Sequence, residues 1–349
     1  MKEFNLNKLL RDNIKRMMPY SSARDEFKDA SADMIFIDAN ENPFSNGLNR
    51  YPDPQQSLVK EELSKIKGVN ASNILLGNGS DEVLDLIFRA FCEPKEDKVI
   101  ALPPTYGMYK VLANTNDVGL INIPLLEGFQ PNVEEIISQQ TSNTKLLFLC
   151  SPNNPTANSF DADKIETLIQ DFQGIVVIDE AYIDFSTQES WVSRLDEFPN
   201  LIVTQTLSKA YGLAAIRLGI CYASQDIIGV LNKIKPPYNV NQLTQEAALK
   251  ALRDQEKVNK EIQEIIEERD QLIRDLQEIE IVQTVYPTDA NFVLVKVDDA
   301  NLRYNQLIKE GIVVRNRSNQ VLCENCLRFT VGTKEENEKL IELIQSLSK

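Results

Sequence analysis

The segment TQTLSKAYGLAAIRLG, residues 204–219, carries one lysine just after two hydroxyl side chains and one arginine eight residues later. Lys209 is a candidate nucleophile, because an amine can form a Schiff base with a carbonyl cofactor. Thr206 and Ser208 are placed to hold a phosphate beside it, and the planar guanidinium of Arg217 suits a phosphate better than a second lysine would. A surface lysine on a turn rich in Ser and Thr is the alternative interpretation.

Strands and helices alternate on both sides of this segment. Short β-branched runs such as KVIALP, KLLFLC, GIVVID, NLIVTQT and RLGICYA are separated by helical or polar segments. This alternation predicts an α/β fold with a mostly parallel sheet that helices cover on both faces. Ligands of such sheets collect at the carboxyl ends of the strands, which is where the polar motifs of this chain fall.

The patterns divide the chain into three parts. We expect an N-terminal arm with a short helix over residues 1–35 and a large domain over residues 36–240. A charged amphipathic connecting helix is expected over residues 241–280. With the strand and helix patterns after it, this helix completes a small α/β domain over residues 241–349. Thr333 and Glu336 have the spacing of a capping box for the last helix.

Composition argues against several kinds of partner. The chain has 37 Lys and Arg against 52 Asp and Glu, a net charge of -15, so a nucleic acid would be bound against repulsion and none is expected. The first twenty residues are charged throughout, and no later apolar run approaches the ~20 residues of a membrane span. Five scattered cysteines form no disulfide framework in a chain of this size. We therefore expect a cytosolic protein without a membrane partner.

Histidine is absent from the sequence, so acid–base chemistry must come from Lys, Tyr, Asp, Glu or Cys. The pair Cys323 and Cys326 has the spacing of half a zinc site. No second pair and no histidine completes the ligand set, and we expect no metal.

Polar residues follow two buried runs upstream of Lys209. GIVVID ends in Asp179, whose carboxylate could keep the nitrogen of a pyridine ring protonated and make the ring an electron sink. Tyr182, three residues on, could donate to a phenolic oxygen of that ring, and Asn154 in SPNNPT could reach the same oxygen. A solvated strand end and an ordinary Asn-Pro turn are the alternatives. The solvated strand end is disfavoured for Asp179 and Tyr182, because Lys209 follows the next strand at the same edge of the sheet. The ordinary turn stays open for Asn154.

Two further segments suit a phosphorylated ring. GNGSDE, residues 77–82, joins a strand to a helix that begins near Ser80, and free N–H groups at a helix start bind phosphate. Asp81 and Glu82 either lie beside that anion or only favour the helix start, and the sequence leaves both readings open. Tyr106 in PPTYGMY could lie flat on the ring, with a core tyrosine as the alternative.

Ten segments together carry a resemblance over nearly the whole chain. They are PYSSAR, DANENPF, RYPDPQ, GNGSDE, PPTYGMY, SPNNPT, IDEAYIDF, TLSKAYGLAAIRLG, NVNQLTQ and LRFTVGT. In this order they resemble the fold-type I aminotransferases that use pyridoxal phosphate, and among these the histidinol-phosphate aminotransferase family. One departure is Ala157, where the family usually has glycine, and it tests whether the loop needs a left-handed residue there.

The resemblance implies a seven-stranded, mostly parallel sheet, pyridoxal 5'-phosphate as cofactor, and a role for each matching residue. Lys209 would be the Schiff-base lysine and Asp179 the partner of the ring nitrogen. Tyr182 and Asn154 would contact the phenolic oxygen, and Tyr106 the ring face. The residues implied around the phosphate are Ser80, Asp81 through its main chain, Thr206, Ser208 and Arg217.

The resemblance also implies substrates and an assembly. Arg328 would bind the α-carboxylate of glutamate, while Arg315, with Tyr20 and Asn239, would bind the substrate phosphate or the distal carboxylate of glutamate. A bidentate arginine accepts either anion, and ordinary surface pairing is the alternative for both arginines. Tyr51 would reach the cofactor phosphate of a neighbouring subunit, which implies a homodimer with two shared sites.

The implied reaction moves the amino group of histidinol phosphate to 2-oxoglutarate, giving imidazole acetol phosphate and glutamate in histidine biosynthesis. Three alternatives share the cofactor residues: an aminotransferase for phenylalanine or tyrosine, an amino-acid-phosphate decarboxylase of the same fold, and a catalytically idle binding relative. The complete set of lysine, aspartate and tyrosine argues against the idle relative.

Overall fold

The computed structural model describes residues 4–20 and 34–347 of the chain. Part of the predicted arm, including the SSAR of PYSSAR, lies outside these ranges. The described part of the arm contains two short helices, α1 (Leu6–Leu9) and α2 (Asp12–Arg16), where one was expected. Leu10 and Ile14 bury their side chains in the core beneath them, so this part of the arm belongs to the body of the protein.

The larger sheet has seven strands in the order β1-β7-β6-β5-β4-β2-β3, which confirms the expected mostly parallel sheet. β7 alone runs against its neighbours β1 and β6. The carboxyl ends of the other six strands therefore meet at one edge. The strands are β1 (Ile74–Asn78), β2 (Lys98–Ala101), β3 (Gly119–Asn122), β4 (Thr144–Cys150), β5 (Ile175–Asp179), β6 (Leu201–Thr206) and β7 (Leu218–Ala223).

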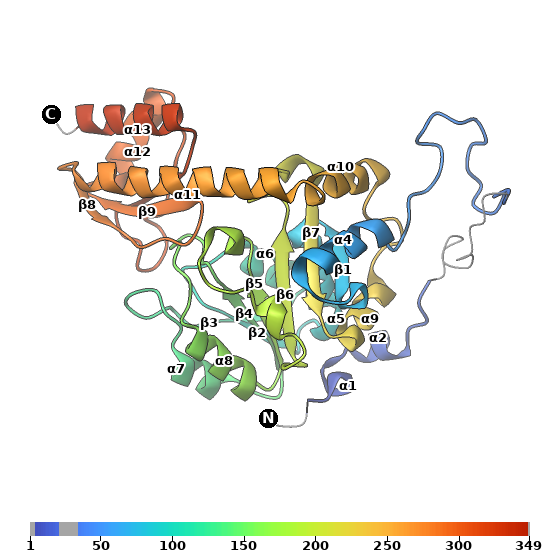
Figure 1. Cartoon of the computed structure of the whole chain (residues 1–349). Helices are drawn as coiled ribbons and strands as arrows, with labels where there is room; N and C mark the ends of the chain where they lie inside the picture. Colours follow the sequence, from blue (N-terminus) through green and yellow to red (C-terminus); the bar gives the residue numbers. More distant parts are fainter. Residues whose placement is uncertain (1–3, 21–33, 348–349) are drawn as a thin grey trace.

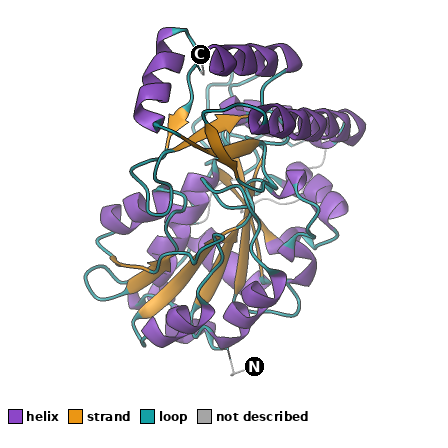
Figure 2. Ribbon diagram, turned by 90° about the vertical axis from the view of Figure 1, so that its left-hand side faces the viewer, coloured by secondary structure: helices purple, strands orange, loops and turns teal. Residues whose placement is uncertain are grey.

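Helices cover both faces of this sheet, as Figure 2 shows. Alternate residues of the strands enter two separate cores, because successive side chains of a strand point to opposite faces. One core includes α4 (Ser57–Lys67), α7 (Val133–Gln139), α8 (Ala162–Asp171) and α10 (Gln242–Leu252). The other includes α2, α5 (Ser80–Phe91), α6 (Met108–Thr115) and α9 (Gln225–Ile234). Burial on both faces explains why these strands read as continuous apolar runs.

A second, antiparallel sheet follows in the order β10-β11-β9-β8. Its strands are β8 (Val282–Val285), β9 (Phe292–Val297), β10 (Arg315–Asn316) and β11 (Cys326–Thr330). It packs with α11 (Gln255–Gln277), α12 (Ala300–Lys309) and α13 (Lys334–Ser346). β10 is the shortest of these strands, with only two residues. The capping box of Thr333 and Glu336 at the start of α13 is confirmed.

The segment expected to be one connecting helix contains two, α10 and α11, with the break near Asp254. The Asp254 side chain accepts a hydrogen bond from the backbone N–H of Lys257 and so caps α11. α10 packs on α4 beside the large sheet, while α11 runs on to the second sheet (Figure 1). Val258 and Ile262 of α11 pack with Tyr182 and Phe292, one from each side of the junction. A domain boundary at residue 240 remains a prediction.

Four short 3-10 helices complete the described structure: η1 (Ala71–Asn73), η2 (Ile183–Phe185), η3 (Trp191–Arg194) and η4 (Ala214–Ile216). Within residues 4–20 and 34–347, no helix combines the length and the apolar character that crossing a membrane requires.

Candidate active site

One pocket at the carboxyl edge of the large sheet gathers ten of the eleven residues predicted to bind the cofactor, all except Tyr51. Its lining is Ser80, Asp81, Tyr106, Cys150, Asn154, Asp179, Ala181, Tyr182, Thr206, Ser208, Lys209 and Arg217. These residues come from the ends of β4, β5 and β6, the start of α5 and the segments that follow the strands. The topology therefore brings together residues that are more than a hundred positions apart in the chain.

Asp179, the last residue of β5, is only 4% exposed. Its Oδ2 accepts a hydrogen bond from the Tyr109 hydroxyl at 2.8 Å, and its Oδ1 accepts one from the backbone N–H of Ala181 at 3.2 Å. Burial raises the pKa of Asp179 to about 6, although the hydrogen bond from Tyr109 acts in the opposite direction. Asp179 is thus a buried carboxylate that still ionises near neutral pH.

Lys209 lies in the turn after β6, exposed at the pocket, with Nζ 5.6 Å from the centre of the Tyr182 ring. Partial desolvation lowers the pKa of Lys209, and the nearby cation Arg328 lowers it further. Both effects increase the share of neutral amine, which is the nucleophilic and basic form.

Arg328 reaches this pocket from the second sheet. Its Nη1 donates to Oδ1 of Asn154 at 2.5 Å, and Nδ2 of Asn154 donates to the Tyr182 hydroxyl at 3.4 Å. The guanidinium lies 5.0 Å from the centre of the Phe292 ring. Burial lowers the pKa of Arg328 to about 10, which leaves it charged at neutral pH. A fixed cation therefore stands at the junction of the two sheets.

The start of α5 meets β7 and the loop after β6 in a cradle of hydrogen-bond donors. Gly79 precedes α5 and has no side chain to cap it. A Cβ at Gly219 would lie 2.2 Å from the backbone nitrogen of Ser80, and a Cβ at Gly79 would lie 2.7 Å from a guanidinium nitrogen of Arg217. The two glycines thus permit the close approach that brings the helix start and Arg217 together.

Hydroxyl groups and one cation complete this cradle. The backbone N–H of Ser208 donates to Oγ1 of Thr206 at 3.1 Å, and the two side-chain oxygens are 3.0 Å apart. Arg217 lies 3.6 Å from Asp81, whose carboxylate also accepts from the Tyr106 hydroxyl at 3.1 Å. A helix start, two hydroxyls and a guanidinium suit a phosphate, and a buried carboxylate with a lysine suits an aldehyde-bearing pyridine ring. The donor set therefore fits pyridoxal phosphate.

The two acids at the start of α5 have different surroundings. Asp81 faces the pocket, whereas the Glu82 carboxylate accepts from the backbone N–H of Asn78 and from Nδ2 of Asn239, the latter at 2.8 Å. Glu82 thus ties the helix start to its flanking loop.

The remaining predicted residues do not line this pocket. Asn239 donates to the Leu76 carbonyl at 3.0 Å and is part of the support of β1. Tyr20 is 73% exposed beside Lys235 at another surface hollow. Arg315 is exposed and lies opposite Arg328 in the register of the neighbouring strands β10 and β11. Their roles in substrate binding stay predictions.

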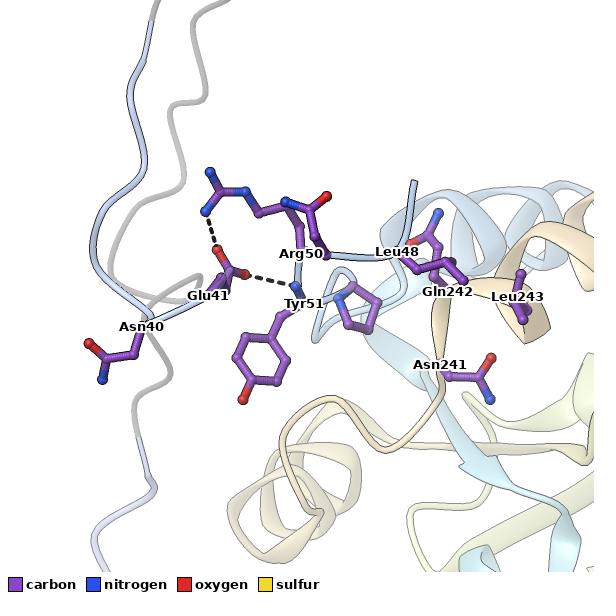
Figure 3. Close-up of a pocket in the computed structure, with 10 residues that line it drawn as sticks. Asn40, Glu41, Leu48, Arg50, Tyr51, Asn241, Gln242 and Leu243 are labelled. Atoms are coloured by element: carbon purple, nitrogen blue, oxygen red, sulfur yellow. Dashed lines mark hydrogen bonds and ion pairs between the residues drawn. The ribbon is translucent and has the colours of Figure 1, made fainter. Parts of the chain in front are cut away.

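Tyr51 lies at a separate surface hollow, shown in Figure 3. Its backbone N–H donates to Glu41 at 2.8 Å, and Glu41 also pairs with Arg50 at 2.6 Å. Tyr51 is 51% exposed, and its ring stacks on that of Tyr238, with 4.4 Å between centres. An exposed aromatic residue held in this way suits contact with a second subunit.

Sequence reasoning missed three residues of the site region. Tyr109 is fully buried behind the pocket, and the motif PPTYGMY contained it without showing which tyrosine turns inward. Cys150 ends β4 and lines the pocket. Arg317 is half-buried near Arg315 and Arg328, and its Nε is buried without a hydrogen-bond partner in the described structure. The sequence signal that could have indicated Arg317 was its position only two residues after Arg315.

Ala157 and the cysteine pair singled out in the sequence both lie in the described part of the chain. Ala157 has φ +70° and is completely buried, so the loop does need a left-handed residue at this position. Cys323 and Cys326 are both buried free thiols, and the backbone N–H of Cys326 donates to the Cys323 carbonyl at 3.0 Å. Among the described residues, no group of three or more His, Cys, Asp or Glu side chains is placed to hold a metal.

Comparison with known proteins places the chain among aminotransferases. The profile of the aminotransferase class I and II family matches residues 22–344. The histidinol-phosphate aminotransferase of Flavobacterium johnsoniae is 62% identical over 349 residues, which are 100% of both chains.

Two crystal structures share the fold. The histidinol-phosphate aminotransferase of Clostridium acetobutylicum has a TM-score of 0.80 at 24% identity, covering 86% of this chain and 91% of that one. That of Sinorhizobium meliloti, in complex with pyridoxal-5'-phosphate, has a TM-score of 0.78 at 23% identity, covering 85% and 83%. The chain belongs to the aminotransferase class I and II family.

Proposed function

We propose that the protein is a histidinol-phosphate aminotransferase that uses pyridoxal 5'-phosphate. The reaction transfers the amino group of histidinol phosphate to 2-oxoglutarate, giving imidazole acetol phosphate and glutamate, a step of histidine biosynthesis. The observation that carries this proposal is the pocket in which Lys209, Asp179 and Tyr182 meet a phosphate cradle, in a chain 62% identical over its full length to an enzyme of that name.

Pyridoxal phosphate, when bound, supplies an aldehyde that forms Schiff bases with amines and a ring that withdraws electrons from the carbon next to that nitrogen. Ser80, Thr206, Ser208 and Arg217 would hold its phosphate. Asp179 would hold a proton on the ring nitrogen, and its burial excludes the water that would weaken this pairing.

Lys209 has two tasks in this proposal. Its Nζ would hold the aldehyde of the cofactor in the absence of substrate. When its amine is free, the same nitrogen would act as the base that removes and returns a proton at the carbon bearing the substrate amine. The lowered pKa of Lys209 supports the second task, because a base works best when its pKa lies near the working pH.

Tyr182, Asn154 and Arg328 form one connected group beside Lys209. Tyr182 and Asn154 would donate to the phenolic oxygen of the ring. Arg328 is charged and half-buried, and its buried Nε has no hydrogen-bond partner in the described structure. Its guanidinium is therefore suited to bind the α-carboxylate of glutamate. Arg315 would bind the phosphate of histidinol phosphate or the distal carboxylate of glutamate, assisted by Tyr20 and Asn239 of the predicted substrate set.

The substrate is tested by single-turnover reactions of the cofactor-loaded protein. Histidinol phosphate, histidinol and phenylalanine are each mixed with it without 2-oxoglutarate, and the visible absorption of the bound cofactor is followed. We expect histidinol phosphate to react fastest. A faster reaction with phenylalanine would favour an aromatic aminotransferase, and release of carbon dioxide from an amino-acid phosphate would favour a decarboxylase. Lys209→Ala should lose both the absorption band and turnover.

We further propose a cytosolic homodimer with shared sites, in which Tyr51 of one subunit reaches the cofactor phosphate of the other. The exposed, stacked ring of Tyr51 supports this assembly. Mixing Lys209→Ala and Tyr51→Ala subunits tests it, because a mixed dimer holds one intact site whereas neither parent has any. Recovery of about a quarter of the wild-type activity per subunit is expected from random mixing. Absence of any recovery in verified mixed dimers would contradict shared sites.

A further inference from the structure

Tyr109, in α6, contacts the candidate site from behind and lies outside the predicted cofactor set. Its side chain is completely buried, and its hydroxyl donates to Oδ2 of Asp179 at 2.8 Å. The other carboxylate oxygen, Oδ1, accepts from the backbone N–H of Ala181 at 3.2 Å. Each oxygen of Asp179 therefore receives one hydrogen bond from the protein while the residue still lines the pocket.

Aromatic neighbours fix the Tyr109 ring in place. It stacks on Phe148 of β4, with 4.7 Å between centres and 15° between planes. Its edge meets Tyr106, with centres 5.7 Å apart and planes at 87°. One buried residue thus touches both Asp179, the expected partner of the ring nitrogen, and Tyr106, the expected neighbour of the ring face.

Resting on the proposed function, we propose that Tyr109 is a positioning residue that orients the Asp179 carboxylate and sets how strongly it holds a proton on the cofactor's ring nitrogen. The physical reason is that a donor aimed at a carboxylate stabilises its charged form. Tyr109 makes the one side-chain hydrogen bond that Asp179 receives among the described residues.

Other charged or titratable groups near Asp179 act over longer range. The charge of Asp81, at the start of α5, makes ionisation of Asp179 harder, and that of Lys209, after β6, makes it easier. Cys150 and Tyr182 also lie close to the carboxylate. These four groups stay in place when only the Tyr109 hydroxyl is removed.

Tyr109→Phe is the direct test, because it removes the hydroxyl and keeps the ring that packs on Phe148 and Tyr106. The control is Tyr222→Phe in β7, where the hydroxyl is equally buried but has no hydrogen-bond partner in the described structure. The first readout needs neither cofactor nor substrate: carbon-13 NMR of labelled aspartate follows the titration of Asp179 in the full-length chain, assigned with Asp179→Asn. We expect Tyr109→Phe to move this titration to higher pH and Tyr222→Phe to leave it unchanged.

The loaded enzyme gives a second readout. The kcat of Tyr109→Phe should fall about tenfold, the effect of one hydrogen bond to a charged group, with little change in KM. The pH dependence of the cofactor's visible absorption should shift as well. A Tyr109→Phe protein with the wild-type titration of Asp179 and the wild-type kcat would overturn the proposal, because the hydroxyl would then be only a packing feature.

A second variant covers the case in which Tyr109→Phe fails to fold. Tyr109→3-fluorotyrosine keeps the hydroxyl and makes it a stronger donor, so the Asp179 titration should move to lower pH. An unchanged titration there would also refute the proposal. If the wild type proves inactive on histidinol phosphate, the proposed function fails, but the titration still decides the role of Tyr109.

Discussion

Asp179→Asn should make the cofactor-free protein more stable at neutral pH while it abolishes the aminotransferase reaction. Burial raises the pKa of Asp179 from its ordinary 3.8 to about 6. Each pKa unit is worth about 1.4 kcal/mol, so ionised Asp179 costs the folded state about 3 kcal/mol at pH 7. Asparagine has nearly the same shape and carries no charge, so the mutant is free of this cost.

The cost depends on pH in a defined direction. Between pH 3.8 and about 6 the folded chain binds more protons at Asp179 than the unfolded chain, so stability falls as pH rises through this window. Below the window both states are protonated and the cost vanishes. Above it the cost is constant. The advantage of Asp179→Asn should therefore grow by about 2 kcal/mol from roughly pH 4.5 to roughly pH 7.5.

Urea unfolding of the cofactor-free proteins across that pH range measures the effect. Asp196→Asn is the control, because Asp196 is exposed in the loop after η3. Its difference in unfolding free energy from wild type should stay small. An Asp179→Asn difference that does not change with pH, or that favours the wild type as pH rises, would refute the assignment of Asp179 as a buried carboxylate whose ionisation destabilises the fold.

Further predictions concern the phosphate cradle and the carboxylate site. Gly79→Ala should destabilise the fold by about 1–3 kcal/mol, since Gly79 has φ 80° and ψ 164°, and weaken cofactor binding about tenfold by displacing Arg217. Gly128→Ala, at φ 81° with nothing within 4 Å, should leave cofactor binding unchanged, and equal effects of both in an equilibrium titration would contradict this. Arg328→Lys should lower kcat/KM for glutamate at least about tenfold, because lysine lacks the guanidinium fork, and affect the half-reaction with histidinol phosphate less. Stopped-flow comparison of the two half-reactions checks it, and equal losses would argue against a carboxylate role.

The large sheet and most of the pocket could be predicted from the sequence, because the polar residues of the pocket directly follow buried apolar runs. Such runs can be recognised as strands from their local sequence pattern. Asp179, Asn154 and Lys209 each come shortly after a buried apolar run, and parallel strands bring such positions to one edge. The start of α5 at Ser80 could also be predicted from local sequence, because a strand, a glycine and an acidic first turn follow one another there.

The features that escaped prediction depend on contacts between distant segments. Arg328 bonds to Asn154 across 174 residues, and no spacing rule reports that distance. Tyr109 turns inward because α6 begins at Met108 and packs against Phe148, which the segment PPTYGMY does not determine. The break between α10 and α11 follows from a cap at Asp254 that helical periodicity hides, since both helices keep apolar residues at similar spacing.

Transfer of a nitrogen atom tests the central claim most directly. Histidinol phosphate labelled with nitrogen-15 at its amine is incubated with the cofactor-loaded protein and 2-oxoglutarate, and the products are analysed by mass spectrometry. We predict labelled glutamate and imidazole acetol phosphate in equal amounts, with neither formed by Lys209→Ala. Unlabelled glutamate, or no glutamate while phenylalanine donates its nitrogen readily, would contradict the account.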